Sequence, residues 1–232
     1  MRLEYYIILR EDILKEKKNG GLDTIVAHQQ IEHFIEIKFV DFIEEQNIVN
    51  EVNVKKIFCL VGASGTGKST ILNYVRSNFN IKVSEVSARP FLPQDKSYVE
   101  SSDDFNQVII TQNRFVCFME PLITGHPMFF SRSPIDGLAY GRVLGCATHI
   151  NDLLKRQIEL TSAAVKYLYV PIEFDMKDEE DKVRGVDIET QKKTDEEMVK
   201  IMEECNIKSV KIFGTKKERL AKIDKLLKEY KK

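Results

Sequence analysis

The sequence has no long uninterrupted hydrophobic run. Its start, MRLEYYIILRED, is broken by charged residues after a few positions, which is unlike a secretory signal peptide. No apolar stretch approaches the roughly 20 residues that a membrane-spanning helix needs. We therefore expect a cytoplasmic protein, in a cell or in a virus-infected cell, with no membrane partner.

Excess charge is also lacking. The 35 basic and 36 acidic residues give a formal net charge of -1, so there is no global positive field for non-specific binding of nucleic acid. Any such binding would need a local basic patch. The length of 232 residues and the 43% hydrophobic content suit one α/β domain with a buried core and an appended segment.

Cysteine is scarce and widely spaced. Cys59, Cys117, Cys146 and Cys205 form no CxxC pair, and three of them lie in apolar runs. This pattern predicts buried, reduced thiols rather than disulfides or a zinc site.

Strand-like and helix-like segments alternate from residue 54 onward. The predicted strands are 56–61, 81–86, 126–130, 166–170 and 210–213, and the predicted helices are 69–79, 103–122, 135–164 with a break at Gly145, 194–205 and 216–230. This alternation predicts a doubly wound, mainly parallel five-stranded sheet with helices on both faces. Residues 1–53, with a strand-like run at 5–9 and an amphipathic pattern at 23–46, are expected to form a small N-terminal α+β extension to this domain of residues 54–232.

A glycine-rich segment follows the first strand of this domain. The segment GASGTGKS, residues 62–69, matches G-x-x-x-x-G-K-[ST] at each fixed position, between a buried strand and a helix. Its glycines allow backbone N–H groups to turn inward toward phosphate oxygens, and the helix N-terminus adds partial positive charge. The lysine is expected to reach the β and γ phosphates, and the serine hydroxyl to ligate Mg²⁺. The predicted nucleotide-binding residues are Gly62, Ser64, Gly65, Thr66, Gly67, Lys68, Ser69 and Thr70.

Polar residues follow the carboxyl ends of the next strands, where ligands bind in open α/β sheets. Glu85 ends the second strand and can accept a proton from an attacking hydroxyl, and Arg89 can hold an acceptor or a phosphate. From their positions alone, Glu85 and Arg89 could equally be ordinary surface residues with no role in the site.

The third strand leads into SRSPID, residues 131–136. Ser131 stands where phosphate-loop proteins commonly carry an acidic residue that helps to position Mg²⁺. Ser131 with waters, Asp136 or Glu120 can take over that task. Arg132 has the planar, bidentate geometry that suits a phosphate.

A charged segment at 175–187 separates the fourth strand from the last helices. A lid at about 175–198 would bring Arg184, and with less support Lys182, over the transferred phosphate to neutralise its charge. A solvated charged loop is the alternative.

Together, GASGTGKST, the EVSAR segment at 85–89, SRSPIDGLAY at 131–140 and the KVRGVD loop resemble a known group of P-loop kinases. This group contains the ribosylnicotinamide kinase part of bacterial NAD regulators and the phage-encoded thymidylate-kinase-like proteins, within the P-loop AAA-type ATPase domain families. Deoxynucleoside kinases and phage polynucleotide kinases are more distant relatives. The resemblance covers about residues 55–230, so it implies a P-loop NTPase fold for most of the chain.

The resemblance implies particular roles. Glu85 would be the base, Arg89 and Arg132 would contact the acceptor or a phosphate, Arg184 would belong to the lid, and Gln107 would line the acceptor pocket together with Asp136. One departure stands out, because relatives usually carry Asp or Glu where this chain has Ser131.

We therefore predict an ATP- and Mg²⁺-dependent kinase for a nucleoside, a nucleotide or a related ribose compound, with Lys68, Glu85, Arg132 and Arg184 as catalytic residues. A polynucleotide 5′-hydroxyl kinase, which would bind a nucleic acid 5′ end, is one alternative. A nucleotide-binding regulatory or adaptor module with weak ATPase activity is the other. The sequence leaves open whether the chain forms a homo-oligomer.

Overall fold

The computed structural model describes residues 57–85, 117–118, 121, 126–173 and 188–230. The predictions made for the extension at 1–53, for most of the helix at 103–122, and for Arg89, Gln107, Glu120, Lys182 and Arg184 lie outside these residues.

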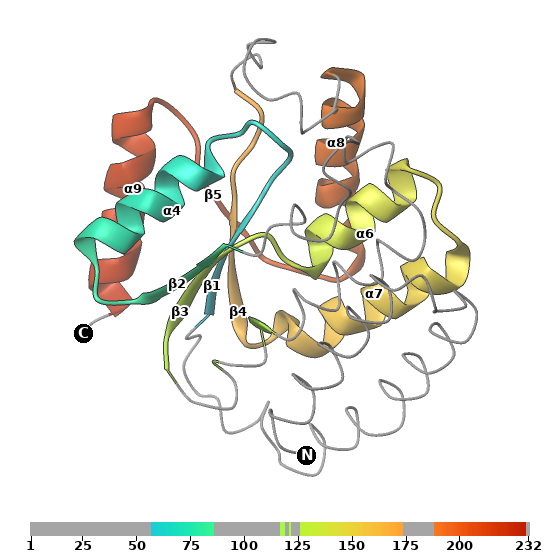
Figure 1. The fold of residues 1–232 in the computed structure, drawn as a ribbon, viewed down its shortest axis with the longest axis horizontal. Helices are drawn as coiled ribbons and strands as arrows, with labels where there is room; N and C mark the ends of the chain where they lie inside the picture. The colour runs from blue at the N-terminus through green and yellow to red at the C-terminus, as the bar shows by residue number, and fades with distance from the viewer. Residues whose placement is uncertain (1–56, 86–116, 119–120, 122–125, 174–187, 231–232) are drawn as a thin grey trace, which may run out of the picture. The chain divides into compact units, whose positions relative to one another are not determined.

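The described strands form one parallel sheet (Figure 1). They are β1 (Ile57–Val61), β2 (Lys82–Glu85), β3 (Met128–Ser131), β4 (Val165–Tyr169) and β5 (Val210–Lys211), in the spatial order β2-β3-β1-β4-β5. Each pair of neighbours is parallel, which confirms the predicted parallel five-stranded sheet. β1 is buried along its whole length, as a strand covered on both faces requires.

Helices cover both faces of this sheet (Figure 1). On one face lie α4 (Lys68–Asn78) and α9 (Lys216–Tyr230), and on the other lie α6 (Pro134–Val143), α7 (Thr148–Ser162) and α8 (Ile188–Glu204). Between α6 and α7 the chain turns at Gly145, whose φ of +77° is the left-handed conformation that glycine adopts without steric cost. The predicted break at this glycine is confirmed.

Alternate residues of the strands divide the core into two layers. Phe58 and Leu60 of β1 pack with Phe129 of β3 against the apolar side chains of α4 and α9. On the other face, the Phe130 ring packs against Phe118, with 4.7 Å between ring centroids. Burying one large apolar side chain contributes about 1.5–3 kcal/mol, so these two layers fix the register of the sheet.

One predicted boundary was wrong: α8 begins at Ile188, not at Thr194. Its buried face includes the polar Gln191 and Thr194 before the apolar Met198 and Ile201. Polar residues at buried positions conceal the hydrophobic period on which the prediction rested. Residues 188–198, expected to be part of a lid, are therefore helical.

The four cysteines form no disulfide with one another, as expected, but their burial differs from the prediction. Cys59 is fully buried in β1, whereas Cys117, Cys146 and Cys205 are only partly buried. In the described part of the chain, no helix is both long enough and apolar enough to cross a membrane.

An ion-pair network joins α6 to α8. The Arg142 guanidinium donates two hydrogen bonds of 2.9 Å to the Glu204 carboxylate and lies 3.5 Å from Glu197. The hydrogen bonds from Arg142 lower the pKa of Glu204 below its ordinary value of 4.5. A lowered carboxyl pKa means that this pair stabilises the fold above the ordinary pKa, and that the stabilisation is lost as the pH falls through the lowered value.

We predict that Arg142→Met lowers the free energy of unfolding by about 0.2–1 kcal/mol at neutral pH, because the pair is partly exposed and screened by solvent. Urea unfolding of both proteins between neutral and acidic pH measures this, and the difference is expected to shrink in acid. A difference of the same size at both ends of the pH range would contradict the assignment.

Candidate functional site

The carboxyl ends of three neighbouring strands meet at one edge of the sheet. In the register, Ser131 of β3 lies beside Leu60 of β1 on one side and Glu85 of β2 on the other. The phosphate loop leaves β1 at this edge, because Gly62 follows Val61 directly. Segments far apart in the sequence are thus brought together by the strand order.

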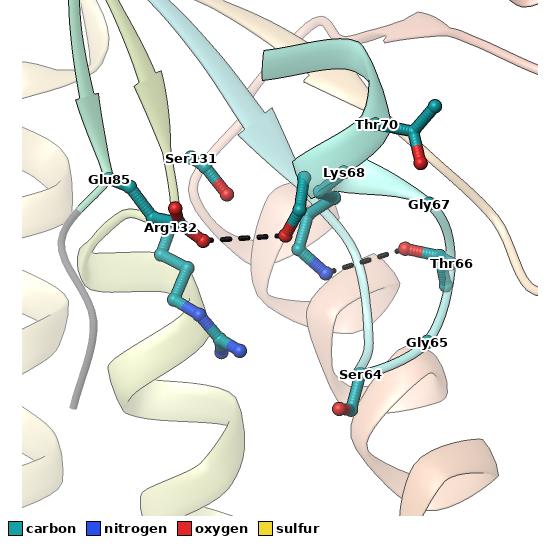
Figure 2. Close-up of a pocket in the computed structure, with 10 residues that line it drawn as sticks. Ser64, Gly65, Thr66, Gly67, Lys68, Thr70, Glu85, Ser131 and Arg132 are labelled. Atoms are coloured by element: carbon teal, nitrogen blue, oxygen red, sulfur yellow. Dashed lines mark hydrogen bonds between the residues drawn. The ribbon is translucent and has the colours of Figure 1, made fainter. Parts of the chain in front are cut away.

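A pocket opens between the loop and these strand ends (Figure 2). It is lined by Ser64, Gly65, Thr66, Gly67, Lys68, Ser69, Thr70, Glu85, Ser131 and Arg132. The structure therefore brings the predicted loop residues together with three of the predicted strand-end residues. Gly62 lies outside this lining, at the start of the loop.

The glycines of the loop occupy backbone conformations that favour glycine. Gly65 and Gly67 have φ of +78° and +90°. At Gly62 a Cβ atom would lie 2.3 Å from the carbonyl oxygen of Val170, a backbone atom that cannot move aside easily. The loop is thus pressed against the chain that follows β4, and a side chain at Gly62 would displace it.

Lys68 lies inside the loop and is almost fully buried, at 6% exposure. Its ammonium donates hydrogen bonds to the carbonyl oxygens of Gly62 and Ala63, each at 2.5 Å, and to the Thr66 hydroxyl at 3.3 Å (Figure 2). A charged group is buried at low cost only when its donors are satisfied in this way. The positive charge is therefore already held at the centre of the loop, where phosphate oxygens bind in P-loops.

Glu85 contacts the first turn of α4. The Ser69 hydroxyl donates a hydrogen bond of 3.3 Å to the Glu85 carboxylate across the pocket (Figure 2). The predicted metal-ligand hydroxyl and the predicted base are thus neighbours, although 16 positions separate them along the chain.

Arg132 enters the pocket through an unusual turn. Its φ is +83°, which is rare for a residue other than glycine, and its backbone N–H donates to the Leu60 carbonyl at 3.1 Å. Such strained conformations persist when the surrounding structure enforces them, and they cluster at functional sites. This turn ends β3 and directs the Arg132 side chain to the pocket wall that faces the loop (Figure 2).

Asp136 is fully buried and is not among the residues that line the pocket. Its carboxylate accepts hydrogen bonds from the backbone N–H of Ser133 at 2.8 Å and from the Ser133 hydroxyl at 3.1 Å. The two residues form a capping box at the start of α6, and the sequence S-x-x-D could have signalled it. This cap fixes the turn that carries Arg132.

Several polar residues around the loop were not predicted. Gln191 of α8 donates to the Ser64 carbonyl at 2.5 Å, and Arg219 of α9 donates to the Thr66 carbonyl at 2.7 Å. Asp195 accepts from the Tyr169 hydroxyl at 2.7 Å. Burial raises the pKa of Asp195, and the Tyr169 hydroxyl, the Ala63 backbone N–H and the Lys68 ammonium oppose that rise. Arg219 and Asp195 lie in segments predicted as amphipathic helices, and Gln191 precedes the predicted start of α8. No local sequence signal marks any of the three.

A glycine-rich loop between a buried parallel strand and a helix, with a buried lysine at its centre, defines a P-loop NTPase. The model of the family described as an AAA domain matches residues 57–219, which is more than half of the chain, so the chain belongs to this family. This match confirms the family and the fold that the motifs predicted. No curated protein sequence matches the chain.

Solved structures share the fold at low sequence identity. A NadR protein in complex with NR matches with a TM-score of 0.59 and 16% identity, over 79% of this chain and 53% of that one. Deoxyadenosine kinase from M. mycoides, with products bound, matches with a TM-score of 0.55 and 10% identity, over 74% of this chain and 99% of that one. Thymidylate kinase from Ehrlichia chaffeensis matches with a TM-score of 0.51 and 13% identity, over 75% of this chain and 99% of that one. The chain spans about half the length of the NadR protein.

We predict that Gly62→Ala impairs ATP binding, because the added Cβ would collide with the Val170 carbonyl and displace the loop. Gly145→Ala is the matched control, since its Cβ would meet nothing within 4 Å and costs only the strain of a positive φ, about 1 kcal/mol. Titration calorimetry with ATP and thermal unfolding of both variants separate the two effects. Equal ATP affinity in both variants would show that the close approach at Gly62 does not shape the binding loop.

Proposed function

We propose that this protein is an ATP- and Mg²⁺-dependent kinase that transfers the terminal phosphate to a nucleoside, a nucleotide or a related ribose-containing acceptor. The observation that carries this proposal is the approach of the Glu85 carboxylate to the Ser69 hydroxyl at the open side of the loop. A carboxylate there would lie beside the transferred phosphate, where it could accept a proton from an incoming hydroxyl. The fold that the chain shares with kinases supports the same reaction class.

The residues of the pocket fit a magnesium ion. Mg²⁺ prefers oxygen ligands, keeps several waters, and is usually bound through one or two carboxylates and the substrate phosphates. The Ser69 and Ser131 hydroxyls supply such oxygens at one wall of the pocket, and the substrate phosphates would supply the others. Among the described residues there is no cluster of three His, Cys, Asp or Glu side chains that would form a dedicated metal cage. Bound Mg²⁺ would neutralise phosphate charge and orient the phosphate chain.

The side chains of the pocket have different roles in the transfer of the phosphate. The Lys68 ammonium exchanges its hydrogen bonds to the loop carbonyls for bonds to the β and γ phosphates. The acceptor hydroxyl gives its proton to Glu85 as its oxygen bonds to the γ phosphorus, and the bond from that phosphorus to the β-phosphate oxygen breaks, which releases ADP. Arg132 balances negative charge on the transferred group. Positioning and electrostatics supply most of the catalysis in such a reaction.

The direct test is incubation of the full chain with labelled ATP, Mg²⁺ and a panel of nucleosides, nucleotides and 5′-hydroxyl oligonucleotides. Labelling of a nucleoside or nucleotide is the expected result. Labelling of the oligonucleotides alone would identify a polynucleotide kinase instead. Slow ATP hydrolysis that no acceptor changes would overturn the proposal in favour of a regulatory or adaptor module.

We predict that Lys68→Met lowers kcat by about 10²–10³-fold, the usual loss when one preorganised donor to a transition-state oxygen is removed. Lys217→Met is the matched control, because Lys217 is an exposed residue of α9. Steady-state transfer rates measure both, and circular dichroism checks that both fold. Unchanged transfer by Lys68→Met would remove the phosphate loop from the mechanism.

We predict that Glu85→Gln lowers kcat by about 10²–10⁴-fold, as expected for loss of a general base, with little change in the Mg²⁺ concentration that gives half-maximal rate. The control is Glu203→Gln, at an exposed position of α8. A large rise in the Mg²⁺ requirement, with kcat restored at high Mg²⁺, would instead make Glu85 a residue of the metal site.

A further inference from the structure

The outer side of the phosphate loop is held by side chains from two helices. When the N–H groups of a P-loop turn inward, some of its carbonyl oxygens turn outward and need other partners. The Thr66 carbonyl accepts a hydrogen bond of 2.7 Å from Arg219 of α9, and the Ser64 carbonyl accepts one of 2.5 Å from Gln191 of α8. Both donors are buried, with 4% and 2% exposure.

Arg219 binds three segments at once. Besides the Thr66 carbonyl, its guanidinium donates to the Gly214 carbonyl at 2.9 Å and is paired with the Glu173 carboxylate. Gly214 lies in the turn between β5 and α9, and Glu173 follows β4. The planar fork of arginine donors allows this simultaneous bonding, which the single ammonium of lysine cannot reproduce.

The network is ionised at neutral pH. Burial opposes the charge on Glu173, but the hydrogen bonds from Arg219 and from the Gly214 backbone N–H outweigh it, so the pKa of Glu173 lies below its ordinary value. A buried guanidinium is tolerated when it is paired and its donors are bonded. A buried positive charge is therefore fixed against the outer side of the loop.

The bond from Arg219 holds the backbone of Thr66 from the outer side, in addition to the bond that the Thr66 hydroxyl donates to the Ala63 carbonyl at 3.1 Å. Thr66 stands between Gly65 and Gly67, whose φ values of +78° and +90° are held by no side chain of their own. Glycines lose more conformational freedom on ordering than other residues do. A tether on the residue between them reduces the entropy that the loop still has to lose when a ligand binds.

We propose that Arg219 is a positioning residue, which preorganises the phosphate loop from outside through the Thr66 carbonyl and so raises its affinity for a polyphosphate chain. It is not among the residues lining the pocket, so it acts through the loop. This inference rests on the proposed function, because it assumes that the loop binds the phosphates of a nucleotide.

The test compares the binding of inorganic tripolyphosphate and of ATP, each with Mg²⁺, by titration calorimetry on the full chain. In Arg219→Met both affinities are expected to fall by about 10- to 100-fold, the usual effect of losing a hydrogen bond from a charged donor. Arg219→Lys is expected to lie between Arg219→Met and the wild type. Arg142→Met is the matched control, because it removes another paired arginine, one that bonds Glu204 and does not line the pocket. It should leave both affinities within about twofold.

A second measurement separates positioning from general stability. Hydrogen–deuterium exchange of peptides covering residues 62–69 should quicken in Arg219→Met, while peptides of α6 stay unchanged. If Arg219→Met does not fold, the same measurements on Arg219→Lys and Glu173→Gln decide the question. Wild-type affinity and exchange in the folded variants would overturn the inference. Wild-type protein that binds neither ATP nor tripolyphosphate would overturn the proposed function itself.

Discussion

The site depends on one constraint, which is that the backbone of a glycine-rich loop must present its N–H groups to the same small volume. Three features of the structure hold the loop in this conformation. The strand before the loop is fully buried, the chain after β4 leaves no room for a side chain at Gly62, and the carbonyl oxygens of the loop are bonded by buried side chains. Inside the loop, the Lys68 ammonium supplies the positive charge.

The parallel sheet supplies the rest of the site. Because β3 lies between β1 and β2, the residues that follow or end these three strands converge at one edge. Glu85 reaches the first turn of α4 from β2, and Arg132 reaches the pocket from the turn after β3. The capping box of Ser133 and Asp136 fixes the start of α6 and thereby the turn that carries Arg132. The helix cap thus stabilises the start of α6 and also positions the Arg132 side chain.

The polar groups of the site differ in how they are neutralised. Lys68 and Arg219 are both buried cations, one inside the loop and one behind it, and both donate to loop carbonyls. The Arg219 guanidinium is paired with the Glu173 carboxylate, and the Lys68 ammonium acts on the Asp195 carboxyl through its charge. The inner cation lines the pocket, whereas the outer one lies behind the loop and is not among the residues that line it.

The fold class followed from local patterns. An apolar strand, a glycine-rich loop and a helix at fixed spacing specified the P-loop, and alternation of strands and helices specified the parallel sheet, because each pattern acts over short stretches of chain. The boundary of α8 was mispredicted because Gln191 and Thr194 are polar residues on a buried face. Gln191 bonds the Ser64 carbonyl of the loop, which lies 127 positions earlier in the chain.

The sequence by itself determined that a glycine-rich loop follows the first buried strand, that Lys68 and Ser69 begin the helix after it, and which residues end the neighbouring strands. Only the tertiary structure decided that Ser69 meets Glu85, that Asp136 caps a helix and does not line the pocket, and that Arg219 holds the loop from behind. The physical reason is that the residues of a motif are set by the backbone conformation of their own short segment of chain. Contacts between side chains distant in sequence depend on strand order and helix packing.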